Sequence, residues 1–289
     1  MRIGIIGLGL IGGSLAKTLR ARTAHTLYGT DLNADTVREA VSAGVLDAPL
    51  GERELAQCDV IAVALFPGAI IGWLRENAAR IAKNAVVFDC GGIKTAVCEN
   101  CFALAEQHGF VFFGGHPMAG TERSGWAAAR SGLFDNASML LVRPVPGGAL
   151  CEERIAAAES LLEKFFLSLG FGRVVRTTAP AHASTIGYTS QLAHVVSSAY
   201  IKSPTARNYV GFSAGSFKDM TRVAFLNENM WTELFLDNAA PLVGEIDFLI
   251  ERLAEYRDAI AAGDGTRLKE LLADGKQLKL LSDRAAKPD

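Results

Sequence analysis

The stretch Ile3-Gly-Ile-Ile-Gly7-Leu-Gly9-Leu-Ile-Gly12 decides the fold class of this chain. A strand-sized apolar run leads directly into three glycines, and the residues that follow show the apolar spacing of a helix. The pattern G-x-G-x-x-G between a strand and a helix is typical of dinucleotide-binding folds. Gly7 permits the tight turn, Gly9 permits a pyrophosphate to approach the backbone, and Gly12 lets the helix pack on the strand.

A carboxylate stands where the second strand of such a fold ends. The apolar run at residues 26–29 leads to Asp31, which comes 19 residues after Gly12. A carboxylate at this place accepts hydrogen bonds from the adenosine ribose and repels a 2′-phosphate. We therefore expect NAD as the cofactor, with NADP less favoured. The expected cofactor-binding residues are Gly7, Gly9, Leu10, Ile11, Gly12 and Asp31.

The composition excludes several classes of protein. With 29 basic and 31 acidic side chains the formal net charge is −2, so the chain has no electrostatic footprint for nucleic acid or an anionic membrane. A hydrophobic content of 49% argues against disorder, and no apolar stretch reaches the ~18 residues of a membrane span. Five cysteines, an odd number in a long chain, favour reduced thiols in a cytoplasmic protein over a disulfide framework.

Short apolar runs alternate with helical patterns through the first 177 residues, whereas only long helical patterns follow. The alternation predicts βαβ units and a Rossmann-type doubly wound parallel sheet. We therefore expect an α/β NAD-binding domain at residues 1–177 and an all-α domain at residues 178–289. The expected strands are 3–6, 26–29, 60–65, 85–88, 111–113, 139–142 and 174–175, and the expected helices are 11–19, 35–43, 70–81, 95–108, 183–201, 231–235, 242–260 and 267–281.

A histidine follows the expected strand 111–113, in the segment Gly114-Gly-His116-Pro-Met-Ala-Gly-Thr-Glu122-Arg-Ser-Gly125. The carboxyl ends of parallel strands line the crevice in which α/β folds bind ligands. A neutral imidazole in that crevice can accept a proton from a hydroxyl whose carbon loses hydride. The alternative for His116 is a loop histidine bonded to backbone.

The same segment resembles the hallmark H-P-M/I-A-G-x-E-x-S-G of the prephenate dehydrogenase family, the prephenate and arogenate dehydrogenases of tyrosine biosynthesis. Three further segments are similar to family motifs and come in the same order. They are Asp89-Cys-Gly-Gly-Ile-Lys94 for D-x-x-S-x-K, Ser190-Gln-Leu-Ala-His194 for S-H-x-P-H, and Phe217-Lys-Asp-Met-Thr-Arg222 for F-R/K-D-x-T-R, with Trp231 beyond. The resemblance covers nearly the whole chain.

This resemblance implies an enzyme that oxidises the C4 carbinol of prephenate or arogenate with NAD+, while the ring carboxylate leaves as CO2. It implies that His116 bonds the C4 hydroxyl and takes its proton, that Arg222 binds a substrate carboxylate, and that His194 contacts the substrate from the opposite wall. Arg222 has the alternative of pairing with Asp219 on a helix. The other expected site residues are Glu122 and Asp219 at the entrance, and Lys94, Trp231 (alternatively a core residue) and Gly92 near the substrate.

The chain departs from the family pattern at two places. Gly92 stands where the family has a serine that bonds the substrate hydroxyl and orients the histidine, so we expect water, Thr95 or Ser124 to substitute. Gln191 and Ala193 replace a histidine and a proline, and we expect this change to bear on the choice between prephenate and arogenate. Three histidines match no motif and are expected to be surface or capping residues, namely His25, His108 and His182.

Other readings of parts of the sequence remain open. A β-hydroxyacid dehydrogenase or imine-reductase-like oxidoreductase shares a Rossmann domain followed by helices, and would rely on a lysine such as Lys202 or Lys218. A non-catalytic NAD-binding sensor would fit the missing serine at Gly92. The pair Cys98-x-x-Cys101 lacks the second pair that a zinc site needs, so no metal is expected.

We expect the helical domain to resemble the 6-phosphogluconate dehydrogenase C-terminal domain and to form a homodimer. Its helices carry more apolar surface than a domain of this size can bury alone. Within these 289 residues we expect neither a regulatory ACT module nor a chorismate mutase module. The apolar residues that suggest dimerisation are Leu234, Phe235, Leu236, Phe248, Leu249 and Ile250.

Overall fold

The computed structural model describes residues 1–121, 123–148 and 150–285. The chain forms two compact units, Met1–Asn238 and Ala239–Asp289. The larger unit therefore contains the sheet and the first part of the helical region, and the predicted domain boundary at residue 177 remains a prediction. None of the helices in the described residues combines the length and apolar composition that crossing a membrane requires.

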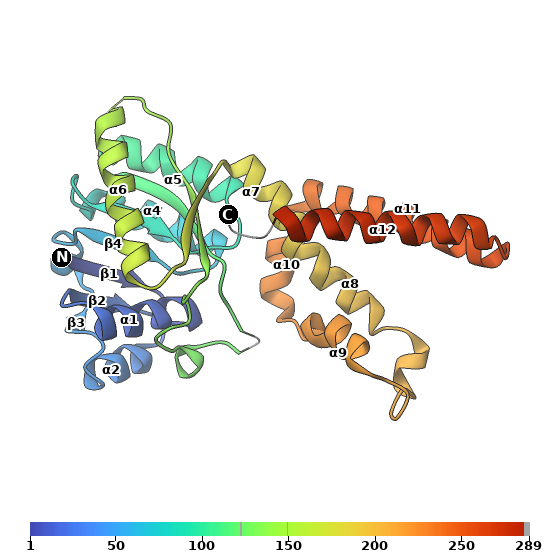
Figure 1. Ribbon diagram of the computed structural model, residues 1–289. Coiled ribbons are helices and arrows are strands. Elements are labelled where there is room, and N and C mark those ends of the chain that lie inside the picture. The colour runs from blue at the N-terminus through green and yellow to red at the C-terminus, as the bar shows by residue number, and fades with distance from the viewer. Residues whose placement is uncertain (122, 149, 286–289) are drawn as a thin grey trace. The chain divides into compact units, whose positions relative to one another are not determined.

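Within the described residues, the centre of the larger unit is one eight-stranded sheet in the order β3-β2-β1-β4-β5-β6-β7-β8 (Figure 1). The strand order reverses between β1 and β4, and in α/β sheets ligands bind at the carboxyl ends of the strands beside this switch point. The strands are β1 (Arg2–Ile6), β2 (Thr26–Thr30), β3 (Ala48–Pro49), β4 (Val60–Val63), β5 (Val86–Asp89), β6 (Val111–Pro117), β7 (Ser138–Val142) and β8 (Arg173–Thr177).

The sheet is mostly parallel, and the Rossmann-type α/β fold is confirmed with one departure. Strand β7 runs antiparallel to β6, with Gly114 opposite Val142, and β8 runs parallel to β7. A parallel neighbour needs a long crossover connection, usually a helix. The described residues between β6 and β7 contain only a short 3-10 turn at Trp126–Ala128, so the chain turns back instead.

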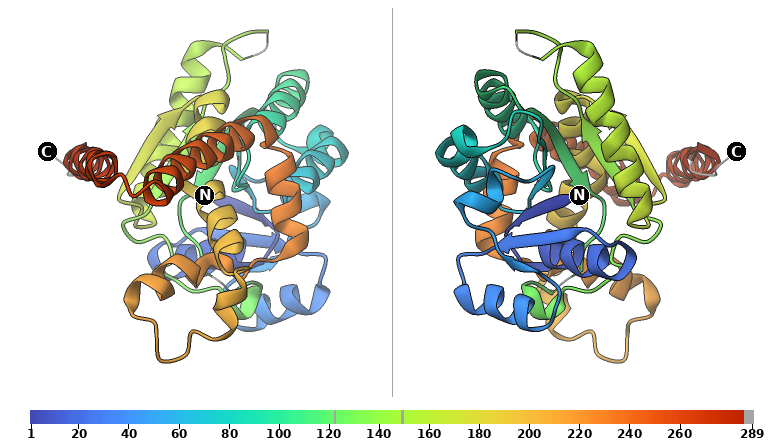
Figure 2. Two further views of the ribbon diagram at one scale, coloured as in Figure 1. Left: turned by 90° about the vertical axis from the view of Figure 1, so that its right-hand side faces the viewer. Right: turned by 90° about the vertical axis from the view of Figure 1, so that its left-hand side faces the viewer.

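Helices cover both faces of the sheet (Figures 1 and 2). One buried cluster lies under α1, α2 and α6, and a second lies under α4 and α5. Helix α6 is absent from the sequence prediction, although apolar residues recur at spacings of three and four along it. The bounds are α1 (Leu10–Arg22), α2 (Ala34–Ser42), α3 (Glu52–Leu55), α4 (Pro67–Asn77), α5 (Thr95–His108) and α6 (Glu152–Ser168).

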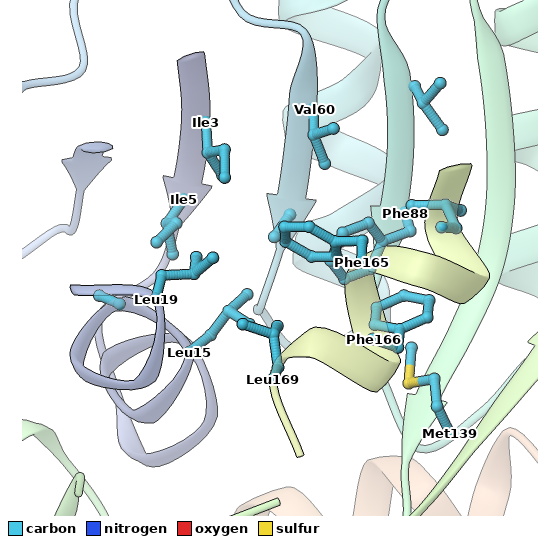
Figure 3. Packing of buried hydrophobic residues seen from close by; sticks show 14 of the residues in the cluster. Ile3, Ile5, Leu15, Leu19, Val60, Phe88, Met139, Phe165, Phe166 and Leu169 are labelled. Carbon is cyan, nitrogen blue, oxygen red and sulfur yellow. The ribbon is translucent and has the colours of Figure 1, made fainter. Parts of the chain in front are cut away.

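Aromatic packing fixes α6 on the sheet (Figure 3). The ring of Phe88 in β5 meets Phe165 and Phe166 edge-on, with centroid separations of 6.1 and 5.0 Å. Beside them, Leu15 and Leu19 of α1 join the same buried cluster. Burial of each such side chain contributes about 1.5–3 kcal/mol. This cluster therefore packs α1 and α6 against the end of β5, and Leu10 and Ile11 at the start of α1 also pack against it.

The predicted helix 183–201 is three consecutive segments. Helix α7 (Ala179–Ile186) begins early because the Thr178 hydroxyl caps its first turn and a proline follows. A π-helical segment, Gly187–Leu192, connects it to α8 (Ala193–Tyr200). The larger unit ends with α9 (Gly215–Thr221) and α10 (Glu228–Leu236).

The smaller unit is a helical hairpin of α11 (Ala239–Ala261) and α12 (Gly265–Ala285). Gly263 has φ +65° between the two helices, as expected for a glycine that ends a helix. Tyr256 Oη donates to the Leu271 carbonyl at 3.1 Å, which ties the hairpin together.

The close backbone contact between Gly115 of β6 and Asp89 of β5 can be tested by substitution. A Cβ on Gly115 would lie 2.2 Å from the Asp89 carbonyl oxygen, so Gly115→Ala forces backbone to move. We expect this variant to lose about 1–3 kcal/mol of unfolding free energy in urea denaturation. The control is Gly120→Ala, whose Cβ would have no neighbour within 4 Å and should cost less than about 0.5 kcal/mol. Equal losses in both variants would contradict this packing.

Candidate active site

The first and third glycines of the motif are required by the fold itself. Gly7 has φ +84°, and its N–H donates to the Thr30 carbonyl at 2.8 Å. A Cβ on Gly7 would lie 2.4 Å from the Ala64 carbonyl oxygen, and one on Gly12 would lie 1.8 Å from the Gly7 carbonyl oxygen. These two positions therefore tolerate no side chain, because strand and helix meet there.

The middle glycine borders open space. A Cβ on Gly9 would have no neighbour within 4 Å. Gly9 precedes α1, whose first turn, which includes Leu10 and Ile11, carries neither a side-chain cap nor an acidic residue. An uncapped helix N-terminus beside open space is suited to a phosphate group. The geometry therefore fits the pyrophosphate of a dinucleotide.

Asp31 lies next to this glycine turn. Its carboxylate accepts the N–H of Leu8 at 2.7 Å and the N–H of Asn33 at 2.9 Å. A carboxylate has about four lone-pair positions, so these two bonds orient the group and leave capacity for ribose hydroxyls. The glycine turn and Asp31, separate in the sequence, thus form one continuous surface for a nucleotide.

The candidate base, His116, lies at the carboxyl end of β6. Its Nδ1 is 2.9 Å from His182 Nε2. Burial, together with the neighbouring His182 and Lys94, holds the pKa of His116 well below 6.5. A Cβ on Gly92 would lie 4.0 Å from His116 Nε2, so a side chain at position 92 would approach that nitrogen. With glycine at this position, residue 92 places no side chain beside Nε2.

A buried ion pair supports the same strand ends. Asp89 and Lys94 have fully buried side chains and form a salt bridge. The Asp89 carboxylate also accepts the N–H groups of Gly91 at 2.7 Å and of Gly115 at 3.0 Å. Lys94, predicted to lie near the substrate, is therefore committed to Asp89, and its charge acts on His116 through space.

His194 and Trp231 form a second cluster in the helical region. His194 Nδ1 donates to the Val223 carbonyl at 3.0 Å, which leaves Nε2 for a ligand. The His194 and Trp231 ring centroids are 4.0 Å apart, and Trp231 also contacts Phe235 at 5.2 Å. Trp231 is half-buried. This hydrogen bond to the Val223 carbonyl also places the neighbouring residue, Arg222, close to α8.

Helix α10 connects the two clusters. A Cβ on Gly92 would lie 3.5 Å from a Leu234 methyl carbon, and the Glu233 carboxylate accepts the Gly68 N–H at 2.9 Å. The helix that carries Trp231 thus contacts both the Gly92 loop and the start of α4. The structure brings His116 and Gly92 together with this helix within the larger unit.

The other predicted residues have simpler positions. Asp219, on α9, and Arg222, in the 3-10 turn Arg222–Ala224, are both exposed. Glu122 lies outside the described residues. Gln191 is buried, donates to the Leu234 carbonyl at 2.8 Å and accepts from Asn238 at 2.6 Å. Its amide therefore joins the π-helical segment to the end of α10.

The prediction that His182 is a surface or capping residue is wrong. Its side chain is 2% exposed and its ring contacts that of His116. The error follows from the predicted helix start at residue 183, which left His182 in a loop. The signal was present in Thr178 and Pro180, a capping residue followed by a proline, which together mark a helix start.

Comparison with protein families agrees with this architecture. Residues 15–165 match the model described as prephenate dehydrogenase, nucleotide-binding domain, and residues 178–274 match the model described as prephenate dehydrogenase, dimerization domain. The chain belongs to the prephenate dehydrogenase family. It is therefore a dehydrogenase, and the glycine turn and His116 both lie in or beside the part matched by the nucleotide-binding model.

Similar proteins extend over nearly the whole chain. Cyclohexadienyl dehydrogenase of Zymomonas mobilis is 27% identical over 288 residues, covering 96% of this chain and 94% of the relative. Prephenate dehydrogenase of Lactococcus lactis is 27% identical over 289 residues, covering 96% and 76%. The solved structure of Synechocystis arogenate dehydrogenase superposes with a TM-score of 0.78 at 28% identity, covering 97% of this chain and 100% of that chain. The similarity thus includes both the sheet and the helical region.

The environment of His116 predicts the pH dependence of this dehydrogenase. Its pKa lies below 6.5 because of burial, His182 and Lys94, so the base form persists as the pH falls through 6.5. We expect the acid limb of kcat/KM, measured over about pH 4.5–8.5, to lie below 6.5. The folded state binds this proton less readily than the unfolded state, so the corresponding stability is present above pH 6.5 and lost below it. An acid limb centred at or above 6.5 in folded protein would contradict this assignment.

Proposed function

We propose that this protein catalyses the oxidative decarboxylation of prephenate or arogenate with NAD+, giving 4-hydroxyphenylpyruvate or tyrosine in tyrosine biosynthesis. The observation that carries the proposal is a histidine at the carboxyl end of β6 whose Nε2 lies beside Gly92 and whose pKa is lowered by burial. The membership of the prephenate dehydrogenase family supports it, as do relatives named for prephenate, cyclohexadienyl and arogenate oxidation.

The nucleotide would be held by Gly9, by the start of α1 at Leu10 and Ile11, and by Asp31. When bound, the nicotinamide supplies the acceptor for the hydride that leaves C4 of the substrate. We propose NAD rather than NADP because the Asp31 carboxylate repels a 2′-phosphate. The side chains that follow β2 offer little to offset this repulsion, since Arg38 is paired with Asp35.

His116 acts as the base in this proposal. Its Nε2 accepts the proton of the C4 hydroxyl, which stabilises the positive charge that develops at C4 during oxidation. The electrons of the bond to the departing carboxylate then complete the aromatic ring, CO2 leaves, and His116 returns the proton to the phenolate oxygen. Because burial disfavours the imidazolium form, the ring is in its unprotonated form at neutral pH.

The helical region would hold the substrate. The guanidinium of Arg222 offers a planar pair of donors for a substrate carboxylate. His194 presents Nε2, because its Nδ1 is engaged by the Val223 carbonyl, and Trp231 backs its ring. We propose that Asp219 lies toward the entrance and orders the polar groups there.

The proposed activity predicts turnover of at least one substrate. Purified protein is assayed with prephenate and arogenate, each crossed with NAD+ and NADP+, and reduced nicotinamide should form fastest with NAD+. His116→Asn should lower kcat by about 10²–10⁴-fold, because proton acceptance is lost, while NAD+ binding is kept. The matched control is His108→Asn in the last turn of α5, which should remain active.

Each result of this assay bears on the assignment. If neither substrate is oxidised with either cofactor, the proposed function is wrong. Oxidation of a β-hydroxyacid alone would favour that class of dehydrogenase, although Lys202 and Lys218 are both exposed. NAD+ binding without turnover would favour a sensor. A fully active His116→Asn variant would remove His116 from the mechanism.

We also propose a homodimer formed through the helical region. Large apolar side chains are exposed there, including Leu236 at 70% and Phe248 and Ile250 at 58% each. Such surfaces mark interaction sites, and the matched family model is a dimerization domain.

Light scattering at micromolar concentration should give the mass of two chains. Phe248→Glu on α11 should shift the mass toward one chain, because a carboxylate in an apolar interface loses its solvation. The control Arg53→Glu, on the exposed side of α3, should stay dimeric. A monomeric mass for the unmodified protein would refute this proposal.

A further inference from the structure

His182 has no role among the residues assigned so far, yet it is hydrogen-bonded to the candidate base. Its Nε2 lies 2.9 Å from His116 Nδ1, and the two ring centroids are 5.2 Å apart. The side chain is almost completely buried. Its Nδ1 has no hydrogen-bond partner among the described residues, and a buried unpaired polar atom requires an explanation.

Two neutral imidazoles can share this hydrogen bond in two ways. In the first arrangement His116 Nδ1 carries the proton and donates to His182 Nε2, so His116 Nε2 is bare. In the second arrangement His182 Nε2 donates to His116 Nδ1, and the proton of His116 is on its Nε2. Only the first arrangement allows His116 to accept a proton on the side of Gly92.

We propose that His182 is a positioning residue that accepts the Nδ1 proton of His116 and thereby keeps Nε2 of His116 free to act as the base. The inference rests on the proposed function, which needs a bare Nε2. In this arrangement the proton of the neutral His182 ring is on Nδ1, the nitrogen that has no hydrogen-bond partner among the described residues. Local costs of this kind are found at catalytic sites.

The hydrogen bond also orients the His116 ring. His116 belongs to β6 and His182 to α7, so the contact joins the nucleotide-binding sheet to the first helix of the helical region. A ring held at Nδ1 by a buried partner keeps one plane, and Nε2 then keeps one direction.

A neutral partner suits a base of low pKa. Lys94, which is paired with Asp89, is the charged group that acts on both histidines. Burial and the charge of Lys94 lower the pKa of His182 to about 3, so His182 stays neutral. A carboxylate at this position would orient His116 equally well but would raise its pKa.

The tautomer can be measured without any enzyme assay. The full chain is labelled with ¹⁵N-histidine, and the ring nitrogens are observed by NMR at neutral pH. The signals of His116 are assigned by their loss in His116→Asn. We expect Nδ1 of His116 to be protonated and Nε2 to be bare. Protonation at Nε2 in the unmodified protein would overturn the proposal.

Two substitutions test the role of the acceptor. His182→Leu removes it, and we expect His116 to populate both tautomers and kcat to fall at least about tenfold, with little change in KM. His182→Gln places an amide oxygen near the position of Nε2, so it should keep the Nδ1–H tautomer and retain kcat within about threefold. His25→Leu, at the N-terminal edge of the sheet, is the matched control and should be unchanged.

The outcomes separate this inference from the proposed function. If His182→Leu keeps the tautomer and the kcat of the unmodified protein, His182 does not position the base. If His182→Leu fails to fold, His182→Gln tests the role of the acceptor instead. A folded His182→Gln variant with a kcat as low as that of His116→Asn overturns the proposal. If neither substrate is turned over at all, the proposed function fails, whereas the NMR measurement still decides the tautomer.

Discussion

The carboxylate of Asp89 holds together the part of the sheet from which the candidate site is built. It accepts from Lys94 and from the N–H groups of Gly91 and Gly115, so one buried charge joins β5, the loop after it and β6. Removal of one partner of a buried ion pair typically costs about 3–5 kcal/mol, because the other charge is left without compensation. The positions of Gly92 and His116 depend on this single group.

The same ion pair shapes the chemistry of the site. Lys94 is fully buried, and its positive charge disfavours protonation of both nearby histidines. Lys94 therefore affects both histidines through its charge while it is paired with Asp89. The low net charge of the chain, −2, fits this arrangement, since an anionic substrate would be recognised by a few local donors rather than by the field of the whole protein.

The features that sequence reasoning predicted are those set by local backbone requirements. Gly7 and Gly12 are dictated by close backbone contacts, and Asp31 follows its strand directly. Features set by tertiary contact were missed. The burial of His182 depends on its contact with His116 of β6, and the hydrogen bonds of Gln191 to Leu234 and Asn238 cannot be read from the motif. The described residues between β6 and β7 contain no crossover helix, and the sequence pattern likewise has no helix between the expected strands 111–113 and 139–142, although the antiparallel direction of β7 was not inferred from this gap.

The π-helical segment Gly187–Leu192 has a consequence for the geometry of the two histidines that flank it. Each residue of an α-helix turns the chain by about 100°, so positions 182 and 194 would point about 120° apart in an unbroken α-helix. A π-helical turn contains one more residue than an α-helical turn, and this extra residue does not add a rotation of about 100°. The angle between positions 182 and 194 therefore falls to about 20°. The segment therefore changes the angle about the helix axis between positions 182 and 194. It allows one continuous helical rod to present His182 and His194 toward the same side, and it makes the number of residues between them as important as their identity.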